Sequence, residues 1–392
     1  MKVNKNYQNL HTSYLFGEIY RRTDEYKAKH PDARILNMGV GDVVLPLNKV
    51  VIEAMHKTVD ELSDAKTFQG YVNELGIPSL RKAVAEHYKK FGADVDYDEV
   101  FISSGAADDI GSTLALFSKD NTVAVIEPAY PEYIDANIMD GRNIVHIPSS
   151  DENDFLPLPP KDLKADIIYI CSPGNPTGAS FTREGLKKWV DFANENEAVI
   201  IFDAAYEAYI EDSDIPHSIY EIDGAKTCAI EICSLSKTAG FTGMRCGYTV
   251  VPTGIVSEGI SLNKMWERNR LTRTNGVSFL IQKAAEAVFT DEGQKQIMEN
   301  IEKYKKNARA VTQALTKAGI SFYGGKNSPY IWIHCPDGMD SWEMFDYMIN
   351  KYQLVGTPGG GFGECGKYYF RLSTFCDYET ACEAAKRLTE IE

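Results

Sequence analysis

Short apolar runs, separated in several places by helical patterns, constrain the fold of this 392-residue chain more than any other feature. The runs are rich in Ile, Val and Tyr, and they cover residues 122–127, 144–148, 166–171, 198–203, 227–233 and 246–251. Buried strands joined by helical crossovers form mainly parallel sheets with both faces covered. The sequence therefore predicts an α/β fold, and ligands of such sheets collect at the carboxyl ends of the strands.

Two helices are expected ahead of these strands, over residues 50–63 and 79–91. Asn48 and Ser79 are predicted to be their N-caps, because a short polar side chain can accept a hydrogen bond from a free N–H of the first turn.

The charge of the chain narrows the range of partners. The net charge at pH 7 is −15, which disfavours nucleic acid and anionic membranes because both attract basic surfaces.

The first residues lack the apolar core of a signal peptide, and no apolar run is long enough to span a bilayer. The eight cysteines include no C-x-x-C pair, and the seven histidines form no ligand cluster. We therefore expect a cytoplasmic protein without a metal site.

A lysine lies just beyond one of the apolar runs, in Ser234-Leu-Ser-Lys-Thr-Ala-Gly-Phe-Thr-Gly-Met-Arg245. An unpaired ammonium is costly away from water, so Lys237 is either a solvated surface lysine or a group with a chemical role. A lysine among small residues can form a Schiff base with a carbonyl cofactor. Ser234, Ser236 and Arg245 suit a phosphate group, because the forked donors of arginine match phosphate geometry. This stretch alone leaves both interpretations open.

Four more strand ends carry candidate ligand contacts. Asn175 lies in a rigid turn between two prolines, Asp203 and Tyr206 follow a second strand, and Tyr130 follows a third. Each has an ordinary alternative as a turn residue, a helix cap or a packing residue. At the fourth, a Ser-Gly-Ala turn offers bare backbone N–H groups at a helix N-terminus, which can bind phosphate. That turn lacks the Gly-Lys-Ser/Thr ending of a Walker loop, and a routine tight turn is its alternative.

Taken together, these residues fit pyridoxal phosphate. A buried carboxylate keeps the pyridine nitrogen protonated, so that the ring acts as an electron sink, and Asp203 is the candidate. Asn175 and Tyr206 can bond the phenolic oxygen, Tyr130 can stack on the ring, and Lys237 can hold the aldehyde and later carry a proton. The predicted cofactor contacts are Gly105, Ala106, Ala107, Tyr130, Asn175, Asp203, Tyr206, Ser234, Ser236, Lys237 and Arg245.

Three motifs, in this order, resemble the signature of fold type I aminotransferases: Pro173-Gly-Asn-Pro-Thr-Gly178, Asp203-x-x-Tyr206 and Ser234-x-Ser-Lys-x7-Arg245. The resemblance implies a pyridoxal-phosphate enzyme acting on small amino acids and 2-oxo acids. It also implies that Arg371, in Tyr369-Phe-Arg-Leu-Ser373, grips the α-carboxylate of the substrate.

The same resemblance implies the domain organisation. We expect a large domain with a mostly parallel seven-stranded sheet over residues 40–285. A smaller α/β domain would combine residues 21–39 with 286–392, and residues 1–20 would form an N-terminal arm. Members of that family are homodimers whose active sites lie at the interface between subunits.

Further motifs resemble the LL-diaminopimelate aminotransferase family. They lie at residues 13–22, 39–46, 239–245, 323–330 and 357–363. By this resemblance Tyr14 and Gly41 contact substrate, and Glu74 holds its distal ammonium group. Asn275 and Tyr71 would come from the partner subunit, the first to substrate and the second to cofactor.

One position departs from that family, whose Gly-Ala-Lys is Gly105-Ala-Ala107 here. The missing lysine is expected to help hold the distal carboxylate. We expect transamination between LL-2,6-diaminopimelate and 2-oxoglutarate, giving tetrahydrodipicolinate and glutamate in lysine biosynthesis. The alternatives are an aminotransferase of the same fold for a lysine-like or aromatic amino acid, a pyridoxal-phosphate lyase, and a non-enzymatic pyridoxal-phosphate-binding domain.

Overall fold

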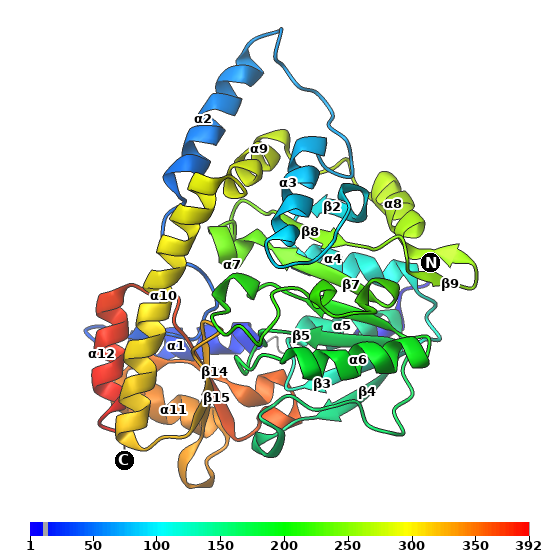
Figure 1. Cartoon of the computed structure of the whole chain (residues 1–392). Coiled ribbons are helices and arrows are strands. Elements are labelled where there is room, and N and C mark those ends of the chain that lie inside the picture. The colour runs from blue at the N-terminus through cyan, green and yellow to red at the C-terminus, as the bar shows by residue number, and fades with distance from the viewer. Residues whose placement is uncertain (11–14, 392) are drawn as a thin grey trace.

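Seven strands form the central sheet of the chain (Figure 1), in a computed structural model that describes residues 1–10 and 15–391. Their order is β2-β8-β7-β6-β5-β3-β4, and every neighbouring pair is parallel except the two that involve β8. This confirms the predicted α/β fold with a mostly parallel seven-stranded sheet. The strands are β2 Val100–Ser103, β3 Thr122–Glu127, β4 Asn143–Pro148, β5 Ile167–Cys171, β6 Val199–Asp203, β7 Ala229–Ser234 and β8 Gly247–Val250.

Helices cover both faces of this sheet, so its strands are buried on both sides. Along β6, Ile200 and Phe202 belong to one buried cluster together with Trp189, whereas Ile201 belongs to another together with Trp266. This alternation follows from the two-residue period of a strand. The helices of this part of the chain are α3 Pro78–Lys89, α4 Ala106–Thr113, α5 Pro131–Asp140, α6 Arg183–Glu195, α7 Leu235–Ala239, α8 Leu262–Arg273 and α9 Phe279–Val288.

A four-stranded antiparallel sheet, in the order β11-β12-β15-β14, forms the centre of a second group of elements. A short parallel pair, β1 and β13, and the helices α1, α11 and α12 lie near it (Figure 1). The bounds are α1 Leu15–Lys29, β1 Leu36–Asn37, α10 Asp291–Ala318, β11 Phe322–Gly324, β12 Tyr330–His334, α11 Ser341–Tyr352, β13 Leu354–Val355, β14 Thr357–Pro358, β15 Tyr369–Ser373 and α12 Tyr378–Leu388.

The beginning of the chain packs against its end. Leu15, Ile19 and Leu36 share a buried cluster with Trp332 of β12 and Phe370 of β15. Helix α1 is continuous across residue 20, where the arm was expected to give way to the small domain. We propose that residues 21–39 with 286–392 form a small domain around this cluster, and that residues 40–285 form the large domain.

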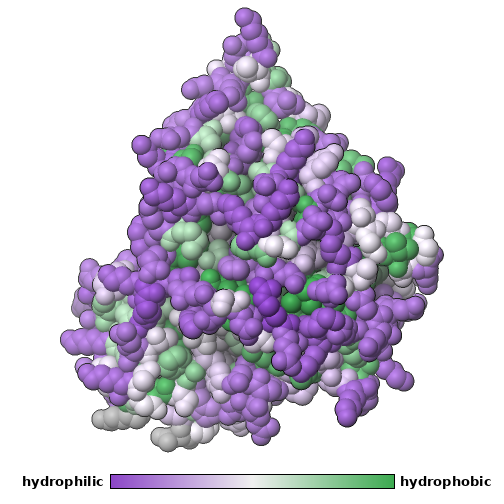
Figure 2. Space-filling model, in the orientation of Figure 1, coloured by the Kyte–Doolittle hydropathy of each residue, from purple (hydrophilic) through white to green (hydrophobic). Residues whose placement is uncertain are grey.

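Helix α2 (Lys49–Ser63) projects from the body of the molecule, and α10 runs from α9 to the four-stranded sheet (Figure 1). A short hairpin of β9 (Val256–Ser257) and β10 (Ile260–Ser261) extends at the right of the view in Figure 1. The face shown in Figure 2 is mostly hydrophilic, in keeping with the high net charge. None of the helices within the described residues is long and apolar enough to cross a membrane.

Candidate active site

A cavity of about 380 Å³ lies between the central sheet and the second group of elements. Its lining comes from strand ends, from the loop that follows β1, and from β12 and β15. Most of the predicted site residues meet here, although they are spread over more than 300 positions of the chain. Those that line it are Gly41, Ala106, Ala107, Tyr130, Asn175, Asp203, Tyr206, Ser234, Ser236, Lys237, Arg245 and Arg371.

Lys237 lies on α7, directly after β7 has ended. Its Nζ donates a hydrogen bond to the carbonyl oxygen of Gly41. Burial lowers the pKa of Lys237 to about 8; the nearby guanidinium groups of Arg371 and Arg245 also lower it, and Asp42 opposes the shift. A lysine with such a pKa is partly neutral near physiological pH, and a neutral amine can act as a nucleophile or a base.

Asp203 ends β6 as a buried carboxylate without an ion-pair partner among the described residues. Its Oδ2 accepts a hydrogen bond from Tyr133 Oη at 2.5 Å, and its Oδ1 accepts one from the Ala205 N–H at 3.0 Å. Burial raises the pKa of Asp203, while these two bonds oppose the shift. A buried carboxylate of this kind favours a cation beside it, and a protonated pyridine nitrogen supplies one. Sequence reasoning missed Tyr133, whose only signal was its place three residues after Tyr130.

Arg371, on β15, is almost completely buried and has no carboxylate within ion-pair distance among the described residues. Its Nη1 donates to Asn175 Oδ1 at 2.6 Å, and its Nη2 donates to the Gly39 carbonyl oxygen at 2.7 Å. Its Nε has no hydrogen-bond partner in the described part of the chain. Burial lowers the pKa of Arg371. A buried guanidinium with spare donors at a cavity is suited to bind a carboxylate.

The other end of the cavity forms a cup of donors. Arg245 Nη1 lies 3.5 Å from Ser236 Oγ, and the Ser236 N–H donates to Ser234 Oγ at 3.1 Å. Gly105 caps α4 with a φ of +121°, and a Cβ at this position would lie 2.7 Å from Arg245 Nη2. A glycine is therefore required here for the guanidinium to approach the helix N-terminus. Guanidinium, hydroxyls and free N–H groups together fit a phosphate group.

Two tyrosines close the cavity beside Arg371. Tyr206 Oη and Tyr330 Oη are hydrogen-bonded at 2.8 Å, and the Arg371 guanidinium lies 4.4 Å from the centre of the Tyr330 ring. Gly41 faces the same hydroxyl, because a Cβ on Gly41 would lie 2.3 Å from Tyr330 Oη. Tyr330 belongs to the motif at residues 323–330, but the sequence did not indicate that its side chain enters the site.

The model of the family "Aminotransferase class I and II" matches residues 33–388, which is most of the chain. The chain belongs to the class I and II aminotransferases. Enzymes of this family depend in general on pyridoxal phosphate and act on small amino acids and oxo acids. The residues of this aminotransferase fit that cofactor, since a lone buried carboxylate, an amine and a phosphate-sized cup of donors line one cavity.

Three of the similar proteins carry the name LL-diaminopimelate aminotransferase. An LL-diaminopimelate aminotransferase of Methanosphaera stadtmanae is 48% identical, over 100% of this chain and 99% of that protein. One of Lachnospira eligens is also 48% identical, over 99% of both chains. The solved structure of L,L-diaminopimelate aminotransferase from Chlamydomonas reinhardtii has a TM-score of 0.94 and 39% identity, over 100% of this chain and 98% of that one.

Three predicted residues of this aminotransferase lie on segments that do not line the cavity. Tyr71 is 87% exposed, Asn275 is also exposed, and neither lines the cavity. Glu74 lies beside Gly276, at which a Cβ would lie 3.2 Å from the Glu74 Cα. Tyr14 lies outside the described residues.

Proposed function

We propose that this aminotransferase uses pyridoxal phosphate to move an amino group between LL-2,6-diaminopimelate and 2-oxoglutarate, giving tetrahydrodipicolinate and glutamate. The names of the relatives with 48% identity over nearly their full length support LL-2,6-diaminopimelate as the amino donor. The observation that carries the reaction type is Lys237, an amine of lowered pKa in one cavity with Asp203 and Arg371. A role in lysine biosynthesis, in the cytoplasm, belongs to the same proposal.

Pyridoxal phosphate, when bound, supplies an aldehyde and a ring that accepts electrons. Asp203 would hold the protonated nitrogen of the ring, with Tyr133 and the Ala205 N–H fixing the carboxylate. Asn175 and Tyr206 would bond its phenolic oxygen, and the face of Tyr130 would cover the ring. The phosphate would lie in the cup formed by Gly105, Ala106, Ala107, Ser234, Ser236 and Arg245.

Lys237 would hold the aldehyde carbon through its amine and would later move a proton at the substrate Cα. The burial that lowers its pKa to about 8 serves both roles, because a base near the working pH accepts and returns a proton efficiently. Arg371 would bind the α-carboxylate, and its bond to Asn175 fixes the guanidinium in position. This arrangement would place the Cα near Lys237.

We also propose that the protein is a homodimer in which each subunit completes the site of the other. Large apolar residues are exposed on α2 and on the loop after it, among them Val59, Phe68 and Tyr71. Such residues are characteristic of an interface. In the dimer, Tyr71 would contact the cofactor of the second subunit, and Glu74 and Asn275 would contact its substrate. Tyr14 and Gly41 would contact substrate as well.

A donor screen tests the substrate. Purified holoprotein, given LL-2,6-diaminopimelate and 2-oxoglutarate, should form glutamate, and it should prefer this donor to lysine and to aromatic amino acids. Lys237→Ala should lose the absorbance band of the bound cofactor and at least about 10²-fold of the activity. Good turnover with another donor and none with diaminopimelate would reject the substrate. A wild-type protein that takes up no pyridoxal phosphate would reject the reaction type.

A further inference from the structure

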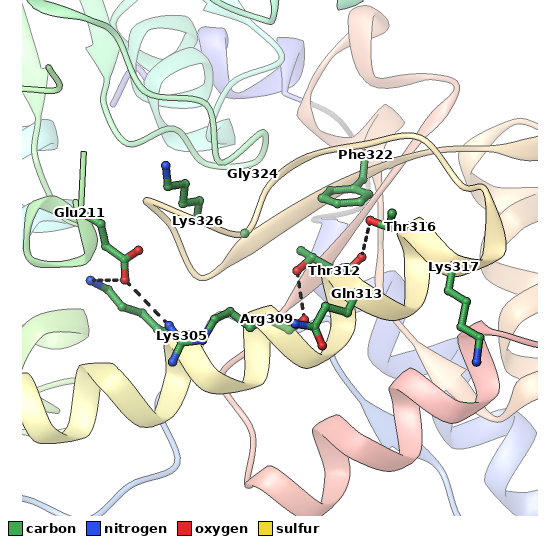
Figure 3. A pocket seen from close by; sticks show the side chains of 11 residues that line it. Glu211, Lys305, Arg309, Thr312, Gln313, Thr316, Lys317, Phe322, Gly324 and Lys326 are labelled. Atoms are coloured by element: carbon green, nitrogen blue, oxygen red, sulfur yellow. Dashed lines mark hydrogen bonds and ion pairs between the residues drawn. The ribbon is translucent and has the colours of Figure 1, made fainter. Parts of the chain in front are cut away.

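A second cavity, of about 550 Å³, lies outside the active site, between α10 and the β11–β12 hairpin (Figure 3). Three separate parts of the chain line it, namely the segment that follows β6, the long helix α10 and the hairpin. We name it the junction pocket and define it by Glu211, Lys305, Arg309, Thr312, Phe322 and Lys326.

The charge of the lining is mostly positive, in a protein whose net charge is −15. Glu211 is the one carboxylate among the described lining residues, whereas Lys305, Arg309 and Lys326 bring three cations to the pocket. The carboxylates that pair with Lys326 and Arg309 from outside, Asp212 and Glu302, do not line it. A fourth cation of the lining, Lys317, points away from the hairpin in Figure 3. Asp212 and Glu302 offset part of this positive charge, so an anion would bind by taking Lys326 and Arg309 from them.

Lys305 is the most informative of these cations, because its side chain is only 8% exposed. It forms an ion pair with Glu211 Oε1 at 3.1 Å, and the same oxygen lies 4.0 Å from Arg309 Nη1. An ammonium group has three donors, and no second acceptor for Lys305 is found among the described residues. A buried ammonium with spare donors beside a cavity favours additional acceptor oxygens there.

The rest of the lining limits the ligand. The hydroxyls of Thr312 and Thr316 donate to carbonyl oxygens of their own helix, at 2.9 Å to Ala308 and 2.9 Å to Thr312. The cations and the side-chain amide of Gln313 are therefore the donors that remain. The ring of Phe322 covers the pocket from the hairpin side (Figure 3) and offers an apolar contact. We propose that the junction pocket binds a small organic dianion with a short apolar body, held by Lys305, Arg309 and Lys326.

The hairpin connects this pocket to the active site. Lys326 lies four residues before Tyr330, and the Gly325 N–H donates to the Tyr330 carbonyl oxygen at 2.7 Å. Tyr330 bonds Tyr206 and stacks on Arg371 inside the catalytic cavity. Asn327 of the hairpin donates to Asp212 Oδ2 at 2.9 Å and accepts from the Glu211 N–H at 2.8 Å, so a dianion that takes Lys326 from Asp212 leaves the hairpin attached to the segment after β6.

Calorimetry on the holoenzyme tests the pocket. Two probes are used, because a dianion can be a dicarboxylate or a phosphate ester: succinate represents the first and glycerol 3-phosphate the second. The double variant Arg309→Gln/Lys326→Gln should bind at least about tenfold more weakly than wild type. Lys187→Gln is the matched control, because it removes an exposed lysine that pairs with Asp191 on α6, away from the pocket. It should bind like wild type. Binding should also weaken as salt is added.

Binding of either probe that depends on Arg309 and Lys326 supports the pocket, and the probe that binds identifies the kind of dianion. Single Arg309→Gln leaves the Lys326–Asp212 pair intact and should show a smaller loss. No saturable binding below about 10 mM, or equal binding by the double variant, overturns the proposal. The first result excludes the pocket as a site, and the second places the probe elsewhere, for example at Arg371.

The pocket proposal does not rest on the proposed function, because calorimetry requires no turnover.

Discussion

Lys237 occupies a position where its positive charge is disfavoured, and this has a consequence for stability as well as for reactivity. The folded chain surrounds the amine with apolar groups and two guanidinium groups, so its pKa lies near 8 rather than at 10.5. Below pH 8 the amine is charged in both the folded and the unfolded chain, and the folded chain bears the full cost of the buried charge. Above pH 10.5 the amine is neutral in both, and the cost disappears.

Lys237→Met should therefore stabilise the cofactor-free protein at pH 7, by at most about 3 kcal/mol. Between pH 8 and 10.5 the unfolded chain binds more protons than the folded one, so wild type becomes more stable relative to the variant as pH rises. Denaturant unfolding of both proteins at pH 7 and pH 10 measures the change. An advantage of the variant that is equal at both pH values would contradict the burial of a charged Lys237.

Gly41 has a steric role that a single methyl group should reveal. In Gly41→Ala the new Cβ would lie 2.3 Å from Tyr330 Oη, so the tyrosine must move from its bond with Tyr206. We expect a loss of about 1–3 kcal/mol in the free energy of unfolding and a higher KM for the amino donor. Gly111→Ala is the control, because nothing lies within 4 Å of its Cβ and a helical glycine is replaced. It should gain about 0.5–1 kcal/mol.

At the scale of the elements, helix starts show where local sequence was informative and where it was not. The prediction that Ser79 caps α3 was wrong, because the helix starts one residue earlier, at Pro78, with Ile77 as its N-cap. Proline suits the first helical position since it has no N–H to leave unpaired. Asn48 does precede α2, but its side chain makes no capping bond and instead accepts a weak one from Asn300 at 3.4 Å.

The start of α11 has a complete capping box, and this can be tested. Asp340 Oδ1 accepts from the N–H groups of Trp342 and Glu343, both at 2.9 Å. Asp340→Ala should cost about 1 kcal/mol, whereas Asp340→Asn should cost little, because asparagine also caps well. Thermal unfolding of the two variants measures the difference. Equal losses would show that the charge of Asp340 matters more than its capping bonds.

At the scale of the whole molecule, the proposed dimer would complete the site of each chain. Lys237 and Arg371 line the cavity of their own chain, whereas Glu74 lies beside Gly276 and away from that cavity. The proposed dimer would bring Glu74 of one subunit to the Lys237 of the other. Two variants that are each inactive can then form a mixed dimer that contains one active site.

Lys237→Ala and Glu74→Gln should each have little activity alone. After denaturation and joint refolding, the mixture should recover about a quarter of the wild-type activity, because half of the dimers are mixed and each mixed dimer has one complete site. Activity of the mixture and its mass by light scattering are the measurements. A monomeric protein, or a mixture no more active than its parts, would contradict the shared site.

Much of this enzyme could be predicted from short-range patterns. The apolar runs predicted the strands of the parallel sheet because side chains buried on both faces leave little room for polar residues. Arg371 was expected at the site because its motif, Tyr369-Phe-Arg-Leu-Ser373, is one continuous stretch of sequence. Tyr133 and Tyr330 were not found, since a tyrosine in the first turn of a helix or at the start of a strand has the same local pattern whether it packs or binds.

The sequence by itself determined the family, the sheet and the order of the residues that bring chemistry to the strand ends. Only the tertiary structure decided which of them meet, because Gly41, Lys237, Tyr330 and Arg371 come from four distant segments whose contact depends on packing. It also decided the pKa of Lys237, since burial and neighbouring charges act through space rather than along the chain. The junction pocket is of the same kind, for its three cations share a cavity only once α10 and the hairpin have packed together.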